Sequence, residues 1–489
     1  MNDPIHADRA ATGAGQLPGS VHMIGIGGAG MSGVARLLLA RGVAVTGSDM
    51  KDSRAVVGLR AMGAVISIGH AEENLTADGG REPEAVVVSF AAIPEDNPEL
   101  KRAKELGIPV LKRSDVLGML MADFRALLIA GTHGKTSTTS MSVAALQAAG
   151  LDPSFAVGGL MSKAGVNAHQ GSGDVFVAEA DESDASLLTY SPQVAVVTNI
   201  EADHLDFFGT PEKYYAVFDA FAGRIVDGGA LVVCAEDERA AQLGERAAKA
   251  GIRVLAYGGE ESLAAHPDLG VGAVLHGWTA AGGGARIEAT VLDQRVTFEL
   301  RQPGRHMALN ALAALVAGRC VDADLERMAR GLSEFTGVRR RFDYHGTIAG
   351  GDFDGVRVYD DYAHHPTEVR AVLGAARELV EDAGRGEVVA VFQPHLYSRT
   401  KAFSAEFAEA LSLADKVVVL DVFGAREAPE PGVDGDLIAR SVTVPVVYEP
   451  HFMSAPDRVR EVAGPHDVVL AIGAGSVTML AGDILEALR

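Results

Sequence analysis

Short apolar runs rich in valine, isoleucine and leucine recur along the whole chain, and a stretch with helical periodicity follows most of them. The runs "VHMIGIG", "RALLIAG", "QVAVVTNIE" and "EVVAVFQPH" are typical. Buried strands that alternate with helices favour parallel sheets covered by helices on both faces. The alternation therefore predicts an α/β fold, and it directs attention to the carboxyl ends of the strands, where such folds bind their ligands.

The chain has 489 residues, which is too long for one ordinary hydrophobic core, so several domains are expected. The strand and helix runs fall into three blocks: a Rossmann-like block, a central block with the parallel sheet of a P-loop ATPase, and a second Rossmann-like block. Residues 265–303 of the central block are rich in Gly, Thr and Val and predict a small antiparallel patch. The predicted boundaries are 1–19 for a disordered tail, 20–123, 124–336 and 337–489.

Composition excludes several classes of partner. The net charge of −22 repels nucleic-acid phosphates and anionic lipid, and no apolar run approaches the roughly 20 residues that a membrane span needs. The first residues lack the apolar core of a secretory signal, and the two cysteines, Cys234 and Cys320, are expected to be free thiols. A cytoplasmic protein that binds neither nucleic acid nor membrane is expected, as a monomer or a homodimer.

A first glycine loop lies between a predicted strand and a predicted helix. Gly25, Gly27 and Gly30 match G-x-G-x-x-G, and Asp49 closes the next strand about twenty residues later. Glycines let the backbone approach a diphosphate, and the helix N-terminus adds partial positive charge. An NAD-type cofactor, another diphosphate ligand and a plain tight turn all remain open at this point.

A second glycine loop, "AGTHGKTST", follows an apolar strand about a hundred residues later. Gly131 and Gly134 are separated by two residues, whereas the usual P-loop has four, but the G-K-T start of the helix is kept. Amides at 132–136 can surround phosphate oxygens, Lys135 can neutralise them, and the Thr136 hydroxyl can bind Mg²⁺. This loop predicts a site for a nucleoside triphosphate.

Two acidic clusters come directly after the next apolar strands. Any single carboxylate there could be a solvated loop residue or a helix N-cap. Two clusters on consecutive strand ends, downstream of a phosphate loop, instead favour the hard divalent cations that bridge ATP phosphates. The clusters are "EADESD", with Glu179, Asp181, Glu182 and Asp184, and "NIEADHLD", with Glu201, Asp203, His204 and Asp206.

With these motifs, "GRHMALNA", "GVRRRFD", "DDYAHHPTEV" and "FQPHLYSRT" follow in a specific order. The chain, from about residue 20 to its end, resembles the Mur ligase family. The resemblance implies that the first loop binds the diphosphate of a UDP-sugar and the second binds ATP. It implies a reaction in which ATP phosphorylates the lactyl carboxylate of UDP-N-acetylmuramate and an amino acid, L-alanine in the branch with the most similar motifs, attacks the acyl phosphate.

The resemblance also assigns residues. It implies ATP binding by Gly131, Thr132, His133, Gly134, Lys135, Thr136 and Ser137, with Asn310 on the adenine side. It implies UDP-sugar binding by Gly25, Gly27, Gly28, Ala29, Gly30, Asp49 and Ser89. It implies amino-acid binding by Tyr362, His364 and Arg399, and Mg²⁺ binding, with Mn²⁺ as an alternative, by Thr136, Glu179 and His204. The implied catalytic residues are Lys135, Glu179, His204, Arg341 and Asp361, with Arg340 and Asp360 as alternatives for the last two.

The sequence departs from the family pattern at two of these places. Met307 stands where the family often has the first Asn of G-x-H-N-x-x-N, and Leu396 stands where many relatives have the first Arg of P-H-R-Y-S-R. Three rival functions are kept: a recycling ligase that attaches a whole tripeptide, an NAD-dependent oxidoreductase with an accessory ATPase domain, and a non-catalytic nucleotide sensor. Acceptance of glycine or serine, the N-acyl group of the sugar and the extent of domain closure stay open.

Overall fold

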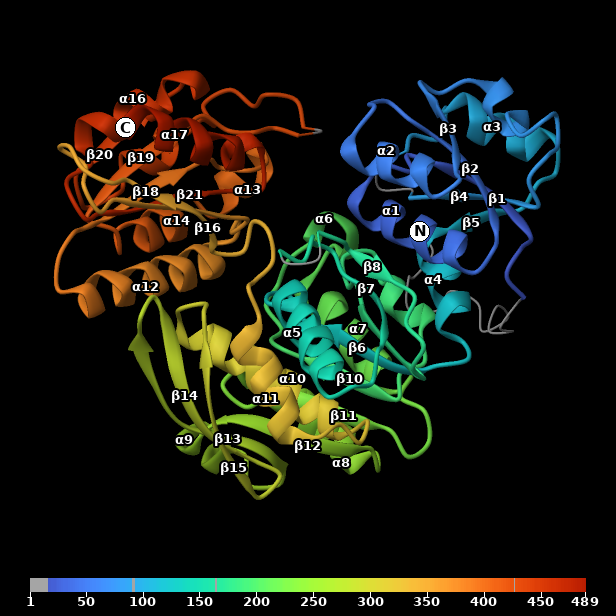
Figure 1. The fold of residues 1–489 in the computed structure, drawn as a ribbon, viewed down its shortest axis with the longest axis horizontal. Coiled ribbons are helices and arrows are strands. Elements are labelled where there is room, and N and C mark those ends of the chain that lie inside the picture. The colour runs from blue at the N-terminus through green and yellow to red at the C-terminus, as the bar shows by residue number, and fades with distance from the viewer. Residues whose placement is uncertain (1–15, 90–92, 163–164, 426) are drawn as a thin grey trace.

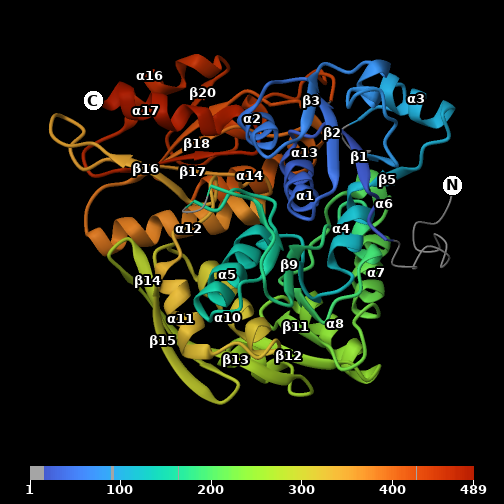
Figure 2. The ribbon, with the colours of Figure 1, turned by 45° about the vertical axis from the view of Figure 1, so that its right-hand side comes forward.

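The computed structural model describes residues 16–489 apart from 90–92, 163–164 and 426. Three α/β domains follow one another along the chain, as expected, and the N-terminal and C-terminal domains sit on the same side of the central one (Figures 1 and 2). Most of the predicted tail lies outside the described residues, and the exact domain boundaries stay a prediction. None of the described helices is both long and apolar enough to cross a bilayer.

The N-terminal domain is a five-stranded parallel sheet in the order β3-β2-β1-β4-β5. The strand order reverses beside β1, so the loops that follow β1 and β4 open at the switch point where such sheets bind ligands. The elements are β1 Ser20–Ile24, α1 Ala29–Ala40, β2 Ala44–Asp49, α2 Arg54–Ala61, β3 Val65–Ile68, η2 Glu72–Thr76, β4 Ala85–Val88, α3 Pro98–Glu105, β5 Val110–Lys112 and α4 Arg113–Met121.

The central domain has a ten-stranded sheet in the order β15-β14-β13-β12-β11-β10-β6-β9-β7-β8. The predicted parallel sheet is correct for its middle, and the antiparallel patch predicted at 265–303 is confirmed in β13, β14 and β15. The antiparallel pairing of β8 with β7 at the other edge was not predicted. The antiparallel patch extends the main sheet because β13 pairs parallel with β12 and then folds back through short turns.

The buried helix α10 packs against α5 and α11 under this sheet. The elements of the domain are β6 Arg125–Ala130, α5 Lys135–Ala148, β7 Ser154–Ala156, β8 Ala168–His169, β9 Val175–Glu179, η3 Ser186–Thr189, β10 Val194–Val197, α6 Leu205–Phe208, α7 Pro211–Ala222, β11 Ala230–Cys234, α8 Glu238–Lys249, β12 Arg253–Gly259, α9 Glu260–Ala265, β13 Gly270–Ala281, β14 Gly284–Val291, β15 Gln294–Leu300, α10 Arg305–Arg319 and α11 Leu325–Glu334.

The C-terminal domain has a six-stranded sheet in the order β16-β17-β21-β18-β19-β20, parallel except for β16. Its long helix α12 lies along the border with the central domain, next to β13 (Figure 1). The elements are β16 Asp343–Thr347, β17 Arg357–Asp361, α12 Pro366–Ala383, β18 Val388–Phe392, α13 Tyr397–Ala402, α14 Ser404–Leu411, β19 Lys416–Leu420, α15 Asp436–Ala439, β20 Val446–Glu449, η4 Phe452–Ser454, α16 Ala455–Val462, β21 Val468–Ile472, η5 Ser476–Met479 and α17 Leu480–Leu488.

Candidate active site

The second glycine loop makes a tight turn between β6 and α5. Gly131 has φ of 127°, and a Cβ on it would lie 2.2 Å from the Thr198 hydroxyl on the neighbouring strand end, so the turn requires glycine. Gly134 has φ of 83° and caps α5. Lys135 and Thr136 therefore open the helix, as the sequence predicted.

Part of the expected phosphate cradle is already occupied by the protein. The Thr132 amide donates to the Asn199 carbonyl at 3.1 Å, and the His133 amide donates to the Asn199 side-chain oxygen at 2.8 Å. The amides at 134–136 stand at the start of α5, where helix amides lack partners within their own helix. Of the amides at 132–136 that were predicted to surround phosphate, those of Thr132 and His133 are therefore bonded within the protein.

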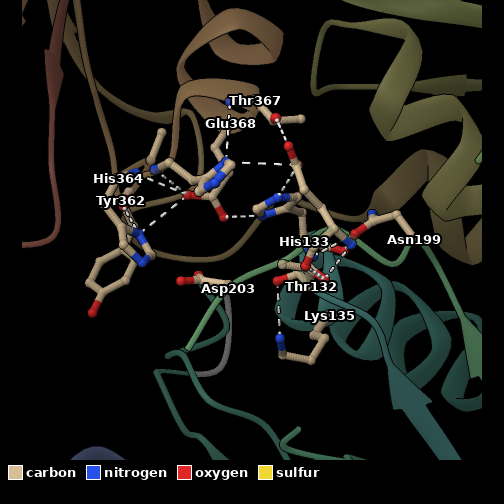
Figure 3. Close-up of polar contacts among 12 residues, drawn as sticks. Thr132, His133, Lys135, Asn199, Asp203, Tyr362, His364, Thr367 and Glu368 are labelled. Carbon is tan, nitrogen blue, oxygen red and sulfur yellow. Dashed lines mark hydrogen bonds and ion pairs between the residues drawn. The ribbon is translucent and has the colours of Figure 1, made fainter. Parts of the chain in front are cut away.

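Lys135 sits at the centre of a charged cluster. Its Nζ donates to the carbonyl oxygens of Gly131 and Thr132, the second visible in Figure 3, and to Oε1 of Glu182 at 2.7 Å. Burial lowers the pKa of Lys135, but the charges of Glu182, Asp181 and Glu179 outweigh it and raise the pKa. Burial raises the pKa of the Glu182 carboxyl to about 7, and its Oε2 has no hydrogen-bond partner among the described residues.

One cavity of about 280 Å³ connects the two glycine loops. Gly30 of the first loop and Lys135 of the second both line it, together with Glu179 and Asp181 at the end of β9. Arg113 from α4 also lines the cavity, and no sequence motif pointed to this residue. The acidic strand end predicted to hold metal therefore lies between the two predicted ligand sites.

The first glycine loop is held by its own acidic partner. The Gly27 amide donates to Oδ2 of Asp49 at 2.9 Å, and the Gly28 amide donates to the Gly25 carbonyl at 3.1 Å. Ala29 begins α1, and its carbonyl accepts from Asn167 of the central domain at 2.6 Å. The structure thus brings Gly25, Gly27, Gly28, Ala29, Gly30 and Asp49 together, and Ser89 follows β4, the strand beside β1.

The side chain of His133 links the central and C-terminal domains. Its Nε2 lies 2.9 Å from Glu201 Oε2, and its Nδ1 lies 3.1 Å from Glu368 Oε1 in the first turn of α12 (Figure 3). Thr367 donates to the other oxygen of Glu201 at 2.9 Å. Burial lowers the pKa of His133, but these two carboxylates outweigh it and raise the pKa to about 9. The sequence assigned no role to Glu368, whose spacing from His365 indicates only a capping box.

Two of the three residues predicted to bind the amino acid, Tyr362 and His364, directly follow β17. The guanidinium carbons of Arg340 and Arg341 lie 4.6 and 5.0 Å from the centre of the Tyr362 ring, and the rings of Tyr362 and His364 are 5.2 Å apart. The third predicted residue, Arg399 in α13, forms an ion pair with Asp203 of the central domain. Arg340 donates to carbonyl oxygens of its own domain, at Gly473 and Gly475, so Arg341 is the freer of the two alternatives.

Asp361 is buried, and both of its oxygens are used locally. Oδ2 accepts from the Phe342 amide and Oδ1 from the Ala363 amide, each at 2.7 Å. Burial raises the pKa of Asp361 to about 6. Its alternative, Asp360, is bonded to Thr478 and lies 3.2 Å from His345.

The predicted metal ligands approach Lys135 from different elements. Thr136 is in the first turn of α5, Glu179 ends β9, and its Oε1 accepts from the Gly158 amide at 2.7 Å. His204 has the left-handed φ of 53°, and burial lowers its pKa. The tight groups of metal-type side chains found in the described part of the chain are His133 with Glu201 and His365, and Asp343 with His345 and Asp360.

The two departures from the family pattern have structural settings. Asn310 is buried in α10 with its amide against Gly134, and its Nδ2 donates to the Met307 sulfur at 3.8 Å. Leu396 caps α13 with φ of 70°, and its amide donates to the Phe423 carbonyl at 3.0 Å.

A larger cavity of about 770 Å³ is lined by none of the predicted site residues. Its lining includes Asp115, Tyr190 and Arg224.

The fold and the site define a class of three-domain proteins in which the first glycine loop, of the N-terminal domain, and the second, of the central domain, line one cavity. The matching family models are "Mur ligase family, catalytic domain" at residues 20–125, "Mur ligase middle domain" at 129–318 and "Mur ligase, glutamate ligase domain" at 340–475. The chain therefore belongs to the Mur ligase family.

Relatives within this family cover nearly the whole chain. A UDP-N-acetylmuramate–L-alanine ligase of Rhodococcus opacus is 55% identical over 96% of each chain. Another, of Mycolicibacterium gilvum, is 56% identical over 97% of this chain and 99% of its own. The crystal structure of the UDP-N-acetylmuramate–alanine ligase MurC of Thermotoga maritima matches with a TM-score of 0.76 and 28% identity, covering 96% of this chain and 98% of that one.

Proposed function

We propose that the chain joins L-alanine to the lactyl carboxylate of UDP-N-acetylmuramate, with ATP converted to ADP and phosphate, in peptidoglycan precursor synthesis. The observation that carries this proposal is the cavity shared by Gly30, Lys135 and Glu179. A sugar diphosphate on the first loop and a triphosphate on the second would meet there. The names of the 55–56% identical relatives support the same substrates.

The chemistry requires activation of the sugar acid, because a carboxylate is a poor electrophile. The γ-phosphoryl group passes to the carboxylate oxygen, ADP leaves, and the resulting acyl phosphate is attacked by the amine of L-alanine. Phosphate then leaves the tetrahedral intermediate and the amide remains. Most of the rate comes from positioning and charge stabilisation, which fits three binding regions on three domains.

ATP would bind on the loop 131–137, with its phosphates on the free amides at the start of α5 and its adenine side near Asn310. The ammonium of Lys135 stabilises charge on the transferring group once the phosphates replace its contact with Glu182. The diphosphate of the sugar nucleotide would lie on the Gly25–Gly30 turn, with Asp49 holding the turn and Ser89 beside it.

The residues near Lys135 fit a divalent cation. Three carboxylates face one ammonium there, and the buried Glu182 Oε2 has no hydrogen-bond partner among the described residues. Mg²⁺, or Mn²⁺ in its place, would be held by the Thr136 hydroxyl, Glu179 and His204. When bound, such an ion screens the repulsion between the phosphates and the sugar carboxylate.

L-Alanine would bind among Tyr362, His364 and Arg399 of the C-terminal domain, with its carboxylate on the arginine. Arg341 lies over Tyr362, and Asp361 accepts from the amides of Phe342 and Ala363, the residues that follow them in the chain. We place the reaction in the cytoplasm, where the free thiols of Cys234 and Cys320 persist. A monomer and a homodimer both remain compatible with this assignment.

The test is phosphate release with UDP-N-acetylmuramate, ATP and Mg²⁺, with one amino acid or the tripeptide added in turn. We expect turnover with L-alanine, with glycine and serine reporting selectivity. Turnover with the tripeptide but not with L-alanine would instead assign the recycling reaction. Tight NAD(H) binding without affinity for the UDP-sugar would assign the oxidoreductase.

A further inference from the structure

The arginine assigned to the amino-acid carboxylate is already held by an acid from another domain. Nη2 of Arg399, in α13, donates to Oδ1 and Oδ2 of Asp203 at 3.0 and 3.2 Å. Both side chains are largely buried, at 10% and 13% exposure. An ion pair shielded in this way fixes the direction of the guanidinium better than a solvent-exposed pair does.

The pairing leaves most of the guanidinium free for a ligand. Arginine has five N–H donors, and both contacts with Asp203 use Nη2. The three donors on Nε and Nη1 have no acceptor among the described residues. Arg399 is thus oriented by one acid and still able to bind another.

Asp203 also organises the turn that carries His204. Its Oδ1 accepts from the His204 amide at 2.8 Å, and His204 has the left-handed φ of 53°, which is uncommon for a residue with a side chain. The same carboxylate thus accepts from the His204 amide and from Arg399. One side chain therefore joins the metal-side turn to the amino-acid arginine.

We propose that Asp203 is a positioning residue for L-alanine: it directs Arg399 of the C-terminal domain toward the amino-acid carboxylate. This inference rests on the proposed function. Because Asp203 acts through Arg399, it governs capture of the amino acid and not the phosphoryl transfer itself.

The test compares steady-state kinetics of the wild type, Asp203→Asn, Asp203→Glu and Arg399→Ala, with L-alanine, ATP and UDP-N-acetylmuramate varied separately. We expect Asp203→Asn to raise the KM for L-alanine by about 10- to 100-fold. The other two KM values and kcat should stay within about threefold. Asp203→Glu should recover part of the loss, and Asp203→Asn should add little to Arg399→Ala, since both act on one contact.

Asp219→Asn is the matched control. Asp219 forms the same kind of pair with Arg246, at 2.8 and 3.1 Å, on the outer surface of the central domain, so its removal should leave all three KM values unchanged. Thermal unfolding of each variant shows whether a raised KM comes from a damaged fold or from a misplaced Arg399. If Asp203→Asn unfolds, Asp203→Glu serves as the test variant in its place.

Three results would overturn the inference while leaving the proposed function intact. The first is an unchanged KM for L-alanine. The second is a lower KM, which would make Asp203 a competitor of the substrate carboxylate. The third is a fall in kcat with altered Mg²⁺ dependence, which would show that Asp203 acts through the metal-side residue His204. A wild type without L-alanine-dependent phosphate release would overturn the proposed function, and this inference with it.

Discussion

At the scale of single residues, the site is organised by carboxylates that hold cations in place before any ligand arrives. Lys135 rests on Glu182, His133 lies between Glu201 and Glu368, and Arg399 is paired with Asp203. Each pair is partly or wholly buried, so removing one partner leaves a charge that water screens poorly. Substitutions here are therefore expected to affect both catalysis and folding, and experiments must measure both.

Lys135→Ala should lower kcat by about 10³-fold or more, because it removes the positive charge beside the transferring phosphoryl group. Phosphate release under saturating substrates measures the effect. Glu182→Gln is the companion variant: it keeps the shape of the lysine's partner, and we expect a much smaller loss. A Lys135→Ala enzyme with near-normal kcat would remove the lysine from the mechanism.

The pH dependence of stability should carry the signature of His133. Its pKa of about 9 in the folded state lies above its ordinary value, so its stabilisation is complete below about pH 6.5 and is lost as the pH rises through 9. Unfolding temperatures of the wild type should fall across this window more steeply than those of His133→Gln. If the unfolding temperatures of the two proteins fall in parallel with pH, the raised pKa of His133 is contradicted.

At the scale of elements, the turn before α5 shows how tightly the backbone is constrained. Gly131→Ala should abolish activity and destabilise the protein by about 1–3 kcal/mol, because it combines a left-handed φ with a clash against Thr198. Gly150→Ala is the control, since its φ of 85° is also unfavourable but nothing lies near its Cβ. Chemical denaturation and phosphate release measure the two effects, and equal losses in both variants would exclude the clash as the cause.

The sequence predicted those features that depend on neighbouring residues. The G-K-T helix start, the acidic ends of β9 and β10, and Pro366 at the start of α12 all follow from local backbone chemistry. The antiparallel patch at 265–303 was predicted correctly. The antiparallel pairing of β7 with β8 was missed, because it depends on which strand is nearest in space.

Contacts between distant segments could not be predicted from spacing. Glu368 reaches His133 across 235 positions, and Asn167 reaches Ala29 across 138. The hydrogen bonds from the Thr132 and His133 amides to Asn199 also join distant segments, and spacing could not predict them. The site assignments themselves came from the resemblance, and the structure adds which of those residues share a cavity.

At the scale of the whole molecule, the C-terminal domain is fastened to the central domain by ion pairs close to the active site. These are His133 with Glu368 and Arg399 with Asp203. Both pairs are largely buried, so salt screens them less than exposed pairs, and loss of one partner is costly. The observed arrangement of the two domains is therefore expected to depend on both pairs.

A double variant, Glu368→Gln with Asp203→Asn, should favour the open form without ligands. Small-angle X-ray scattering should report a larger radius of gyration for the double variant than for the wild type. Identical scattering of both proteins at low salt would show that other contacts hold the domains.

His133 belongs to the loop that we propose to bind ATP, and its Nδ1 lies 3.1 Å from Glu368 Oε1 of the neighbouring domain. If ATP binding requires this contact to break, the rate of ATP capture is limited by domain opening and not by collision frequency. The observed rate of ATP binding in stopped-flow should then level off at high ATP concentration, and Glu368→Gln should raise that plateau.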